Sequence, residues 1–179
     1  MVKVAINGFG RIGKLVFRAI IEKNLKNVQI VAINELGSLE SSLHLVNFDS
    51  THGELKTKLY KSNKGIKYNN KNIIFCSERD PAKLPWKKLG VDVVLECSGV
   101  FTSKEKSHSH IIAGAKKVII SAPAKDVDAT IVQGVNNNIL NKKHNIISNG
   151  SCTTNCLAPV AMVLDKVLGI EAGFMTPVH

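Results

Sequence analysis

A glycine-rich turn near the start of the chain restricts the possible fold more than any other feature. Gly8-Phe9-Gly10-Arg11-Ile12-Gly13 follows a β-branched run, Val2 to Asn7, and precedes an amphipathic stretch, Arg11 to Lys23. A strand, three glycines at this spacing and a helix are typical of the turn that binds the pyrophosphate of a dinucleotide. The pattern therefore predicts a βα unit of the Rossmann type.

Each glycine of this turn has its own physical role. Gly8 permits the tight turn, Gly10 lacks the Cβ that would keep the backbone from the pyrophosphate, and Gly13 lets helix and strand pack closely. The backbone N–H groups of Arg11 and Ile12 are expected to face the phosphates, since the start of a helix favours negative charge.

An acidic residue follows the next predicted strand, Val28 to Asn34. Glu35 stands about 20 residues beyond the glycines, where this fingerprint places the carboxylate that holds the adenosine ribose hydroxyls. A 2′-phosphate beside Glu35 would meet like-charge repulsion. We therefore expect NAD, rather than NADP, as the cofactor.

Short apolar runs alternate with helical stretches further along the chain, which indicates βαβ units around a parallel sheet. We expect a helix over Ser103 to Gly114, capped by Thr102 or Ser103, and an antiparallel excursion outside the main sheet over Leu55 to Phe75. The predicted fold class is α/β, with a Rossmann-type, doubly wound, mostly parallel sheet followed by the beginning of an α+β domain. The further expected strands are Val91 to Cys97, Lys117 to Ser121, Thr130 to Gln133 and Asn145 to Ser148.

The composition changes near residue 150, after the last of these strands. We expect a dinucleotide-binding domain over residues 1–150 and the start of a catalytic domain over 151–179. The second part would hold a helix, Cys152 to Leu168, and an extended segment, Ile170 to His179. Because an unpaired hydrophobic strand makes a poor domain edge, we expect the chain to be the front part of a longer protein.

Composition restricts the class of protein and its partners. The 44% hydrophobic content is ordinary for a folded protein, no apolar stretch is long enough to span a bilayer, and no signal peptide is visible. We expect a cytoplasmic protein without membrane contact, with its four cysteines reduced. The formal charge of +10 attracts anionic ligands, but scattered lysines and 5% aromatic residues disfavour nucleic acid as a partner.

The second predicted helix begins with a cysteine. Ser151 is a natural cap, and Cys152 occupies the first turn, where a helix N-terminus stabilises a thiolate. A structural cysteine, or half of a metal site formed with Cys156, are the alternatives. Metal is disfavoured because no second pair of cysteines occurs, and Cys156 is expected to pack in the core. Cys76 and Cys97 fall in or beside apolar strands and are read as structural.

A thiolate that attacks a carbonyl needs a base. His179, at the end of the segment after this helix, is the best candidate. The other histidines are expected on solvated helix or loop surfaces; they are His44, His52, His108, His110 and His144.

Four motifs together resemble the phosphorylating glyceraldehyde-3-phosphate dehydrogenases, and the similarity covers the whole chain. They are Ile6 to Gly13, Glu96-Cys97-Ser98-Gly99-Val100-Phe101-Thr102, Ser121-Ala122-Pro123-Ala124-Lys125 and Ser148 to Cys156. Met175-Thr176-Pro177-Val178-His179 looks like the catalytic histidine segment of that family.

The resemblance implies a glycolytic oxidoreductase. Cys152 would attack the aldehyde of glyceraldehyde 3-phosphate, hydride would pass to NAD, and inorganic phosphate would release the thioester as 1,3-bisphosphoglycerate. His179 would act as the base, and the Cys152 N–H would suit the oxyanion.

Further roles follow from the same resemblance. Ser151 and Thr153 would contact the phosphate being transferred, while Arg79, Ser98 and Ser121 would line the NAD site. A homotetramer is the expected assembly. The substrate domain of that family continues well beyond the catalytic histidine, so residues 1–179 alone are expected to be inactive.

Three residues depart from the family pattern. Glu35 stands where Asp is common, which keeps the charge but lengthens its reach. Gly150 replaces a common Ala and loosens the turn before the nucleophile. Pro177 replaces a common Thr and removes a backbone donor, which affects the aim of His179 if that donor pairs with a neighbouring strand.

Two other functions remain open on the sequence. Erythrose-4-phosphate dehydrogenase uses the same cofactor domain, and Val31 to Leu36 fits it well, whereas Ser121 to Lys125 looks more like the triose enzyme. The second alternative is a non-catalytic domain that binds NAD or a polyanion. The semialdehyde dehydrogenases share a Rossmann start and a cysteine, but Ser151 to Asn155 does not look like their nucleophile segment.

Overall fold

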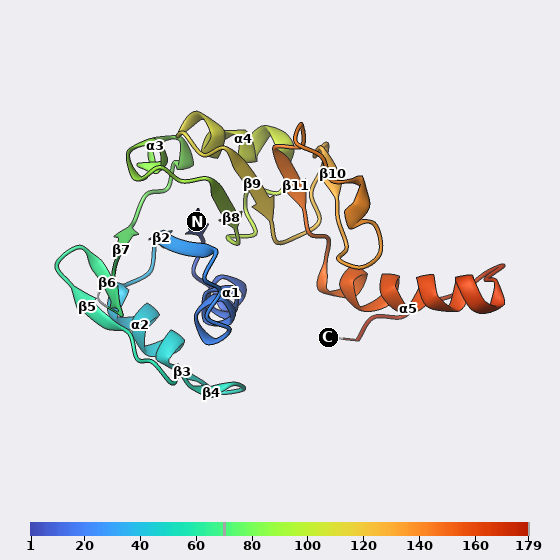
Figure 1. Cartoon of the computed structure of the whole chain (residues 1–179), viewed down its shortest axis with the longest axis horizontal. Coiled ribbons are helices and arrows are strands. Elements are labelled where there is room, and N and C mark those ends of the chain that lie inside the picture. The colour runs from blue at the N-terminus through green and yellow to red at the C-terminus, as the bar shows by residue number, and fades with distance from the viewer. Residues whose placement is uncertain (70, 179) are drawn as a thin grey trace.

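The computed structural model of the chain describes residues 1–69 and 71–178 and has α/β architecture (Figure 1). This part of the chain forms a nine-stranded sheet in the order β10-β11-β9-β8-β1-β2-β7-β6-β5. The strands from β10 to β7 pair in parallel, whereas β6 pairs antiparallel with both β7 and β5. Its strands are β1 Val2–Asn7, β2 Val28–Asn34, β5 Tyr60–Ser62, β6 Gly65–Tyr68, β7 Lys71–Cys76, β8 Val93–Glu96, β9 Lys117–Ile120, β10 Ala129–Thr130 and β11 Ile146–Ser148.

Five α-helices lie between or after the strands in the described residues. They are α1 Arg11–Glu22, α2 Leu39–Asn47, α3 Trp86–Leu89, α4 Lys104–Ile112 and α5 Cys152–Leu168. Serine side chains start three of them, because Ser38, Ser103 and Ser151 each accept a hydrogen bond from the backbone N–H three residues later. Two 3-10 turns, Pro81–Lys83 and Asn137–Ile139, and a small hairpin, β3 Phe48–Asp49 with β4 Gly53–Glu54, complete the fold.

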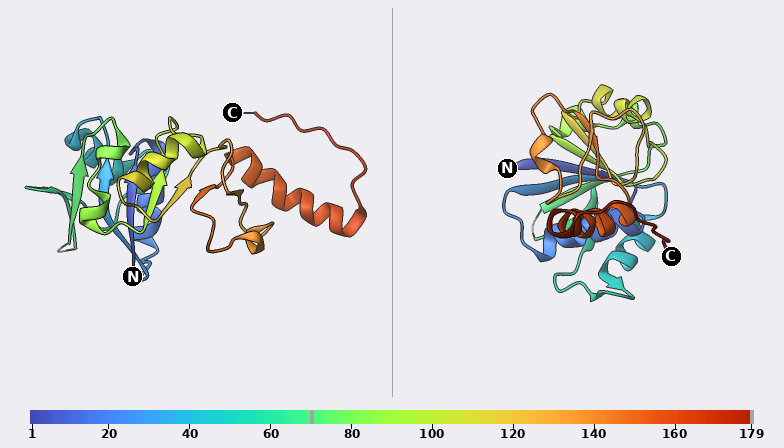
Figure 2. Two further views of the ribbon diagram at one scale, coloured as in Figure 1. Left: turned by 90° about the horizontal axis from the view of Figure 1, so that it is seen from above. Right: turned by 90° about the vertical axis from the view of Figure 1, so that its right-hand side faces the viewer.

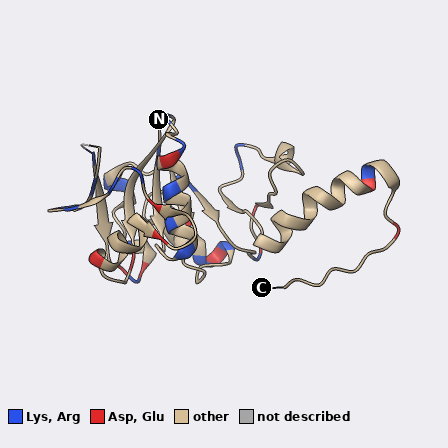
Figure 3. Cartoon of the chain, turned by 90° about the horizontal axis from the view of Figure 1, so that it is seen from below, with Lys and Arg blue, Asp and Glu red and all other residues tan. Residues whose placement is uncertain are grey.

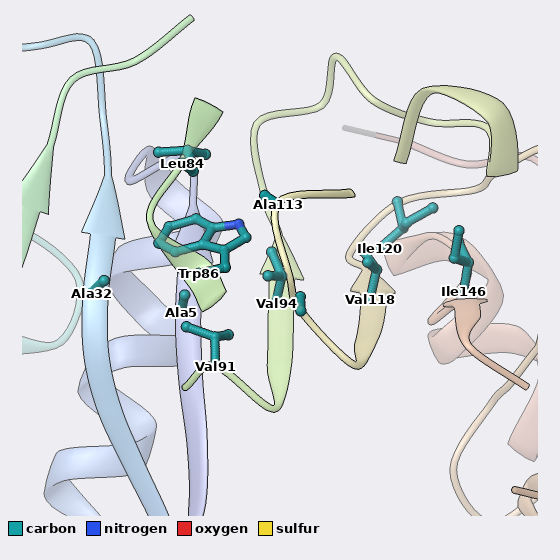
Figure 4. Close-up of a cluster of buried hydrophobic side chains, with 11 residues drawn as sticks. Ala5, Ala32, Leu84, Trp86, Val91, Val94, Ala113, Val118, Ile120 and Ile146 are labelled. Carbon is teal, nitrogen blue, oxygen red and sulfur yellow. The ribbon is translucent and has the colours of Figure 1, made fainter. Parts of the chain in front are cut away.

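The hydrophobic core lies on both faces of the sheet. Successive strand residues point to opposite faces, so Ala5 belongs to one buried cluster and Ile6 to the other. The first cluster surrounds Trp86, which Figure 4 shows beside Leu84 and close to Ala5. The second cluster contains Phe9 and Phe17 of the glycine turn and α1. Burial on two faces explains why these strands read as continuous apolar runs.

The predicted fold class is confirmed, and several elements have the predicted bounds. Strands β1 and β2 and helix α5 coincide with the ranges expected from the sequence, and Ser103 is the residue that caps α4. Gly114, just beyond α4, has φ +105°, a conformation that favours glycine at the end of a helix.

Two expectations about strands were wrong. The antiparallel pairing expected in segment 55–75 is confirmed, because β6 pairs antiparallel with β5 and β7. The expectation that this segment leaves the main sheet was wrong, because β7 pairs in parallel with β2. The strand expected at Thr130 to Gln133 shrinks to β10, two residues paired with β11. Apolar residues of that run, Ile131 and Val132, are nevertheless buried, so they pack without continuing the ladder.

The C-terminal segment also differs from the prediction. Residues 170–178 form no strand with any other described residue, and Phe174 and Val178 are almost fully exposed. A strand needs a partner for its backbone N–H and C=O groups, and the described residues supply none here. His179 lies outside the described residues.

Helix α5 projects away from the sheet (Figures 1 and 2), and none of its residues is buried by the rest of the described chain. Figure 3 shows charged positions on α5 only near its end, and in the sequence these are Asp165 and Lys166. Its exposed apolar side chains include Val160, Val163 and Leu164. A helix of this kind ordinarily packs against another surface.

Candidate active site: a nucleotide pocket and an exposed cysteine

A pocket of about 420 Å³ lies at the carboxyl ends of the central strands. Parallel α/β sheets bind ligands at this edge. Predicted cofactor residues Gly8, Gly10, Glu35, Arg79 and Ser98 all line it. The other lining residues are Asn7, Asn34, Leu36, Glu78, Cys97, Val100 and Phe101.

The glycine turn has the close contacts that its spacing predicts. Gly8 has φ +87°, and a Cβ built on it would stand 2.5 Å from the backbone N of Ser98. A Cβ on Gly13 would stand 2.1 Å from the carbonyl oxygen of Gly8, which no real side chain tolerates. Both positions therefore require glycine for packing within the protein itself.

Gly10 differs because it faces open space. A Cβ there would meet no atom within 4 Å, and Gly10 caps α1 without a side-chain hydrogen bond. Within the part of the chain that the structure describes, the N–H groups of Arg11 and Ile12 have no acceptor. An anion bound at this end of α1 would satisfy both donors.

Glu35 is tied to the glycine turn. Its Oε2 accepts a hydrogen bond from the Phe9 N–H at 2.6 Å, and its Oε1 accepts one from the Gly37 N–H at 3.0 Å. Burial raises the pKa of Glu35, but these backbone donors outweigh that effect, so its pKa lies below the ordinary value. Glu35 is therefore an ionised acceptor at the pocket wall, with lone pairs left for further donors.

Lys14 lies beneath the turn and was not singled out from the sequence. Its Nζ donates to the carbonyl oxygen of Phe9 and lies 5.3 Å from the centre of the Phe9 ring. Burial lowers the pKa of Lys14, and the charge of Glu35 opposes part of that shift. In the sequence, Lys14 is marked only by its position one helical turn after Gly10. Many surface lysines occupy such a position, so this signal is weak.

The side chain of Arg11 points to a structural partner. It forms an ion pair with Asp49, which also accepts hydrogen bonds from the N–H groups of His52 and Thr51. These bonds, the His52 N–H first, hold the pKa of Asp49 at about 2. The guanidinium thus joins α1 to the β3–β4 hairpin, and Arg11 is not among the residues that line the pocket.

One predicted cofactor residue, Ser121, lies outside the pocket. Its N–H donates to the carbonyl oxygen of Glu96, and its hydroxyl lies near the Cys97 thiol, where it opposes part of the pKa shift of that thiol. Burial raises the pKa of Cys97 to about 11 and also raises that of Cys76. These two thiols are thus structural, as expected.

The Cys152 segment follows β11 at the same edge of the sheet. Gly150 turns the chain with φ +69°, and the Ser151 hydroxyl accepts a hydrogen bond from the Thr154 N–H at 2.9 Å. Cys152 is exposed in the first turn of α5. The expected position of the thiol at a helix start is confirmed.

The structure does not bring Cys152 against the pocket. Strands β9 and β8 separate β11 from β1, so about three strand spacings, or roughly 14 Å, lie between the two segments across the sheet. Cys156 is exposed, so its predicted packing in the core was wrong. The reason is that α5 has no neighbour to bury it in the described chain.

The histidines include one surprise. His44, His52 and His108 are exposed as expected and His144 is half-buried, but His110 is fully buried. Its position on α4 faces the sheet, where it contacts Glu96 at 2.9 Å. A polar residue in a short amphipathic helix reads as exposed until the packing of that helix is known.

Other chemistry has little support in the described residues. No helix there is both long and apolar enough to cross a membrane. Within residues 1–69 and 71–178, no three His, Cys, Asp or Glu side chains gather as metal ligands. A second pocket of about 310 Å³, at the opposite edge near Leu25 and Val28, contains none of the predicted site residues.

Comparison with known proteins identifies the family. A family model described as "Glyceraldehyde 3-phosphate dehydrogenase, NAD binding domain" matches residues 2–104, and one described as "Glyceraldehyde 3-phosphate dehydrogenase, C-terminal domain" matches residues 151–179. Ser98 and the glycine turn fall in the first match, and Cys152 in the second.

Curated relatives agree with both matches. A glyceraldehyde-3-phosphate dehydrogenase of Xanthobacter flavus is 52% identical over 178 residues, which are 99% of this chain and 53% of that protein. Those of Zymomonas mobilis and Pseudomonas aeruginosa are 53% and 51% identical over 179 residues, again 99% of this chain, and 53% and 54% of those proteins. The chain therefore spans about half the length of the curated relatives it matches. Since the first family model alone covers more than half of it, the chain belongs to the glyceraldehyde 3-phosphate dehydrogenase family.

Proposed function

We propose that the chain is the NAD-binding part, joined to the start of the catalytic part, of an NAD-dependent phosphorylating glyceraldehyde-3-phosphate dehydrogenase. One observation carries the proposal: the pocket at the glycine turn and Glu35 opens at the sheet edge that also bears Cys152 at a helix start. A division after residue 150 fits this arrangement, since the sheet ends with β11 and α5 begins at Cys152.

The residues present fit NAD. The open space at Gly10 suits a pyrophosphate, and so do the N–H groups of Arg11 and Ile12, which find no acceptor in the described part of the chain. The ionised Glu35 can accept hydrogen bonds from ribose hydroxyls, and Arg79 and Ser98 line the same pocket. Ser121 lies one strand away and would reach the cofactor only at its far end. When bound, NAD supplies the acceptor for the hydride that leaves the substrate.

The chain's own chemistry begins at Cys152. Its thiolate attacks the aldehyde carbon of glyceraldehyde 3-phosphate and forms a C–S bond. The Cys152 N–H, which has no acceptor among the described residues, stabilises the oxyanion. Loss of hydride leaves a thioester, and an oxygen of inorganic phosphate then displaces the thiolate to give 1,3-bisphosphoglycerate. Ser151 and Thr153 are proposed to hold that phosphate, and His179 to accept the proton that the Cys152 thiol loses when it becomes the thiolate.

Several properties of the whole protein belong to the same proposal. The curated relatives carry the name of the triose enzyme, so glyceraldehyde 3-phosphate is favoured over erythrose 4-phosphate. A homotetramer, a cytoplasmic location and a glycolytic role are proposed from the family. The exposed apolar face of α5 supports the need for a covering surface before Cys152 is held in place.

Calorimetry with NAD and NADP tests the cofactor site. The chain should bind NAD at least about 10-fold more tightly, or by about 1.4 kcal/mol, because Glu35 repels a 2′-phosphate. Glu35→Ala should remove that preference. Glu105→Ala, an exposed acidic position on α4, is the matched control. Equal binding of both cofactors by the unmodified chain, or an unchanged preference in Glu35→Ala, would contradict the assignment.

A further inference from the structure

A buried carboxylate stands behind the nucleotide pocket. Glu96, the last residue of β8, is 1% exposed and does not line the pocket. Its Oε1 accepts hydrogen bonds from the N–H and the hydroxyl of Ser98, and its Oε2 accepts one from Nδ2 of Asn7 at 2.6 Å. Ser98 and Asn7 both line the pocket. One buried group thus holds two walls of the site.

The fourth contact of Glu96 fixes the state of His110. Nε1 of Trp86 lies 3.1 Å from Nδ1 of His110, and Nε2 of His110 lies 2.9 Å from Oε2 of Glu96. An indole N–H can only donate, so Nδ1 must accept and the ring proton must sit on Nε2. His110 is therefore a neutral donor to Glu96, held in this tautomer by Trp86.

The same network reaches the adenosine side of the pocket. Oδ1 of Asn7 accepts a hydrogen bond from Nδ2 of Asn34 at 2.8 Å, and Asn34 bonds to the backbone of Glu78 in both directions. On the other side, the ring of Phe101 packs edge-on against His110 with centroids 6.2 Å apart. All four of these pocket residues, Asn7, Asn34, Glu78 and Phe101, are thus oriented from behind.

We propose that Glu96 and His110 are positioning residues for the nucleotide pocket: His110 holds the carboxylate of Glu96, which in turn sets the place of Asn7 and of the Ser98 loop. This inference rests on the proposed NAD site. Four donors converge on Glu96, and a carboxylate has acceptor capacity for all of them. A glutamine places an NH₂ group where one carboxylate oxygen stands. Facing Ser98, it leaves the Ser98 N–H without an acceptor, although the Ser98 hydroxyl can turn to accept from it; facing the other way, it leaves the donors of Asn7 and His110 without one.

The arrangement also explains a contact with the glycine turn. A Cβ placed on Gly8 would stand 2.5 Å from the backbone of Ser98, so the glycine turn and the Ser98 loop are in close contact. Loss of the Ser98 to Glu96 bonds would remove two hydrogen bonds that hold this loop in place beside the turn.

Amide hydrogen exchange and calorimetry test the proposal on Glu96→Gln, with Glu105→Gln on the exposed face of α4 as control. In Glu96→Gln, the Ser98 N–H should lose at least about 10-fold of its protection, while the Val94 N–H within β8 keeps its own. NAD should bind at least about 10-fold more weakly. Glu105→Gln should behave as the unmodified chain in both measurements.

A second pair of variants covers the case in which Glu96→Gln does not fold. His110→Gln can still donate to Glu96 and should stay within about 3-fold of the unmodified chain, whereas His110→Leu cannot donate and should reproduce both losses. Equal loss of protection at Ser98 and Val94 would mean a purely structural role and would overturn the proposal. Unchanged NAD binding in Glu96→Gln or His110→Leu would also overturn the proposal. Absence of NAD binding by the unmodified chain would overturn the proposed function instead, and the Ser98 exchange would still decide whether Glu96 positions the loop.

Discussion

Replacing Gly13 by alanine tests whether the glycine turn is required by the fold itself. The new Cβ would stand 2.1 Å from the Gly8 carbonyl oxygen, 3.2 Å from its carbon and 3.3 Å from Cγ2 of Ile6. Separating the first pair to 3.0 Å requires a backbone shift of about 0.9 Å. Overpacking of this kind costs about 3 kcal/mol at the upper end of its usual range. Alanine regains about 1 kcal/mol of helix propensity, so the net loss is about 2 kcal/mol.

Thermal unfolding followed by circular dichroism measures this loss. For a chain of this size, about 2 kcal/mol corresponds to a Tm lowered by roughly 4 to 8 °C. Gly10→Ala is the control, since its Cβ meets no atom and φ is −72°; its Tm should change by no more than about 2 °C because small cap and unfolded-state effects oppose each other. Its NAD affinity should nevertheless fall, since the methyl group fills the space proposed for the pyrophosphate. A Gly13→Ala chain whose Tm equals or exceeds that of the unmodified chain would refute the reasoning.

Three further predictions follow from the same structure. Brief iodoacetamide treatment near pH 7 should label Cys152 before the other three cysteines. Burial raises the pKa values of Cys76 and Cys97, that of Cys97 to about 11, and Cys156 lies one turn from the helix start. Peptide mapping that finds another cysteine labelled first would contradict the assignment of Cys152 as the nucleophile. The free energy of unfolding should fall between about pH 4 and pH 2. The pKa values of Asp49 and Asp128 are each held at about 2, chiefly by the backbone N–H groups of His52 and Ile146. The folded state therefore binds fewer protons than the unfolded state in this range, and the stabilisation that these carboxylates give above about pH 4 is lost as they protonate. Urea midpoints at pH 5 and pH 2.5 check this, and Asp128→Asn should show a smaller difference between them. The 179-residue chain with NAD, phosphate and glyceraldehyde 3-phosphate should show almost no NADH formation, since α5 is unsupported; turnover near an ordinary enzyme median of about 10 per second would contradict that view.

Local patterns in the sequence were enough to predict much of the fold and the pocket at the glycine turn. Short β-branched, apolar runs located β1 and β2, and a serine before an apolar helical stretch located the start of α5. The glycine spacing and Glu35 identified the pocket, because backbone conformation and close approach at these positions depend on the residues themselves. Such features need no knowledge of distant neighbours.

Tertiary structure alone decided which polar residues are buried and which strands pair. His110 and Glu96 read as ordinary polar positions, yet α4 packs them together behind the pocket with Trp86. Asn7 and Asn34 meet only because β1 and β2 are neighbours in the sheet. Segment 55–75 joins the main sheet because β7 finds an open edge at β2. Turns, helix caps and apolar strand runs are determined by the residues that form them. Hydrogen bonds between residues far apart in the chain depend instead on packing that no local pattern contains.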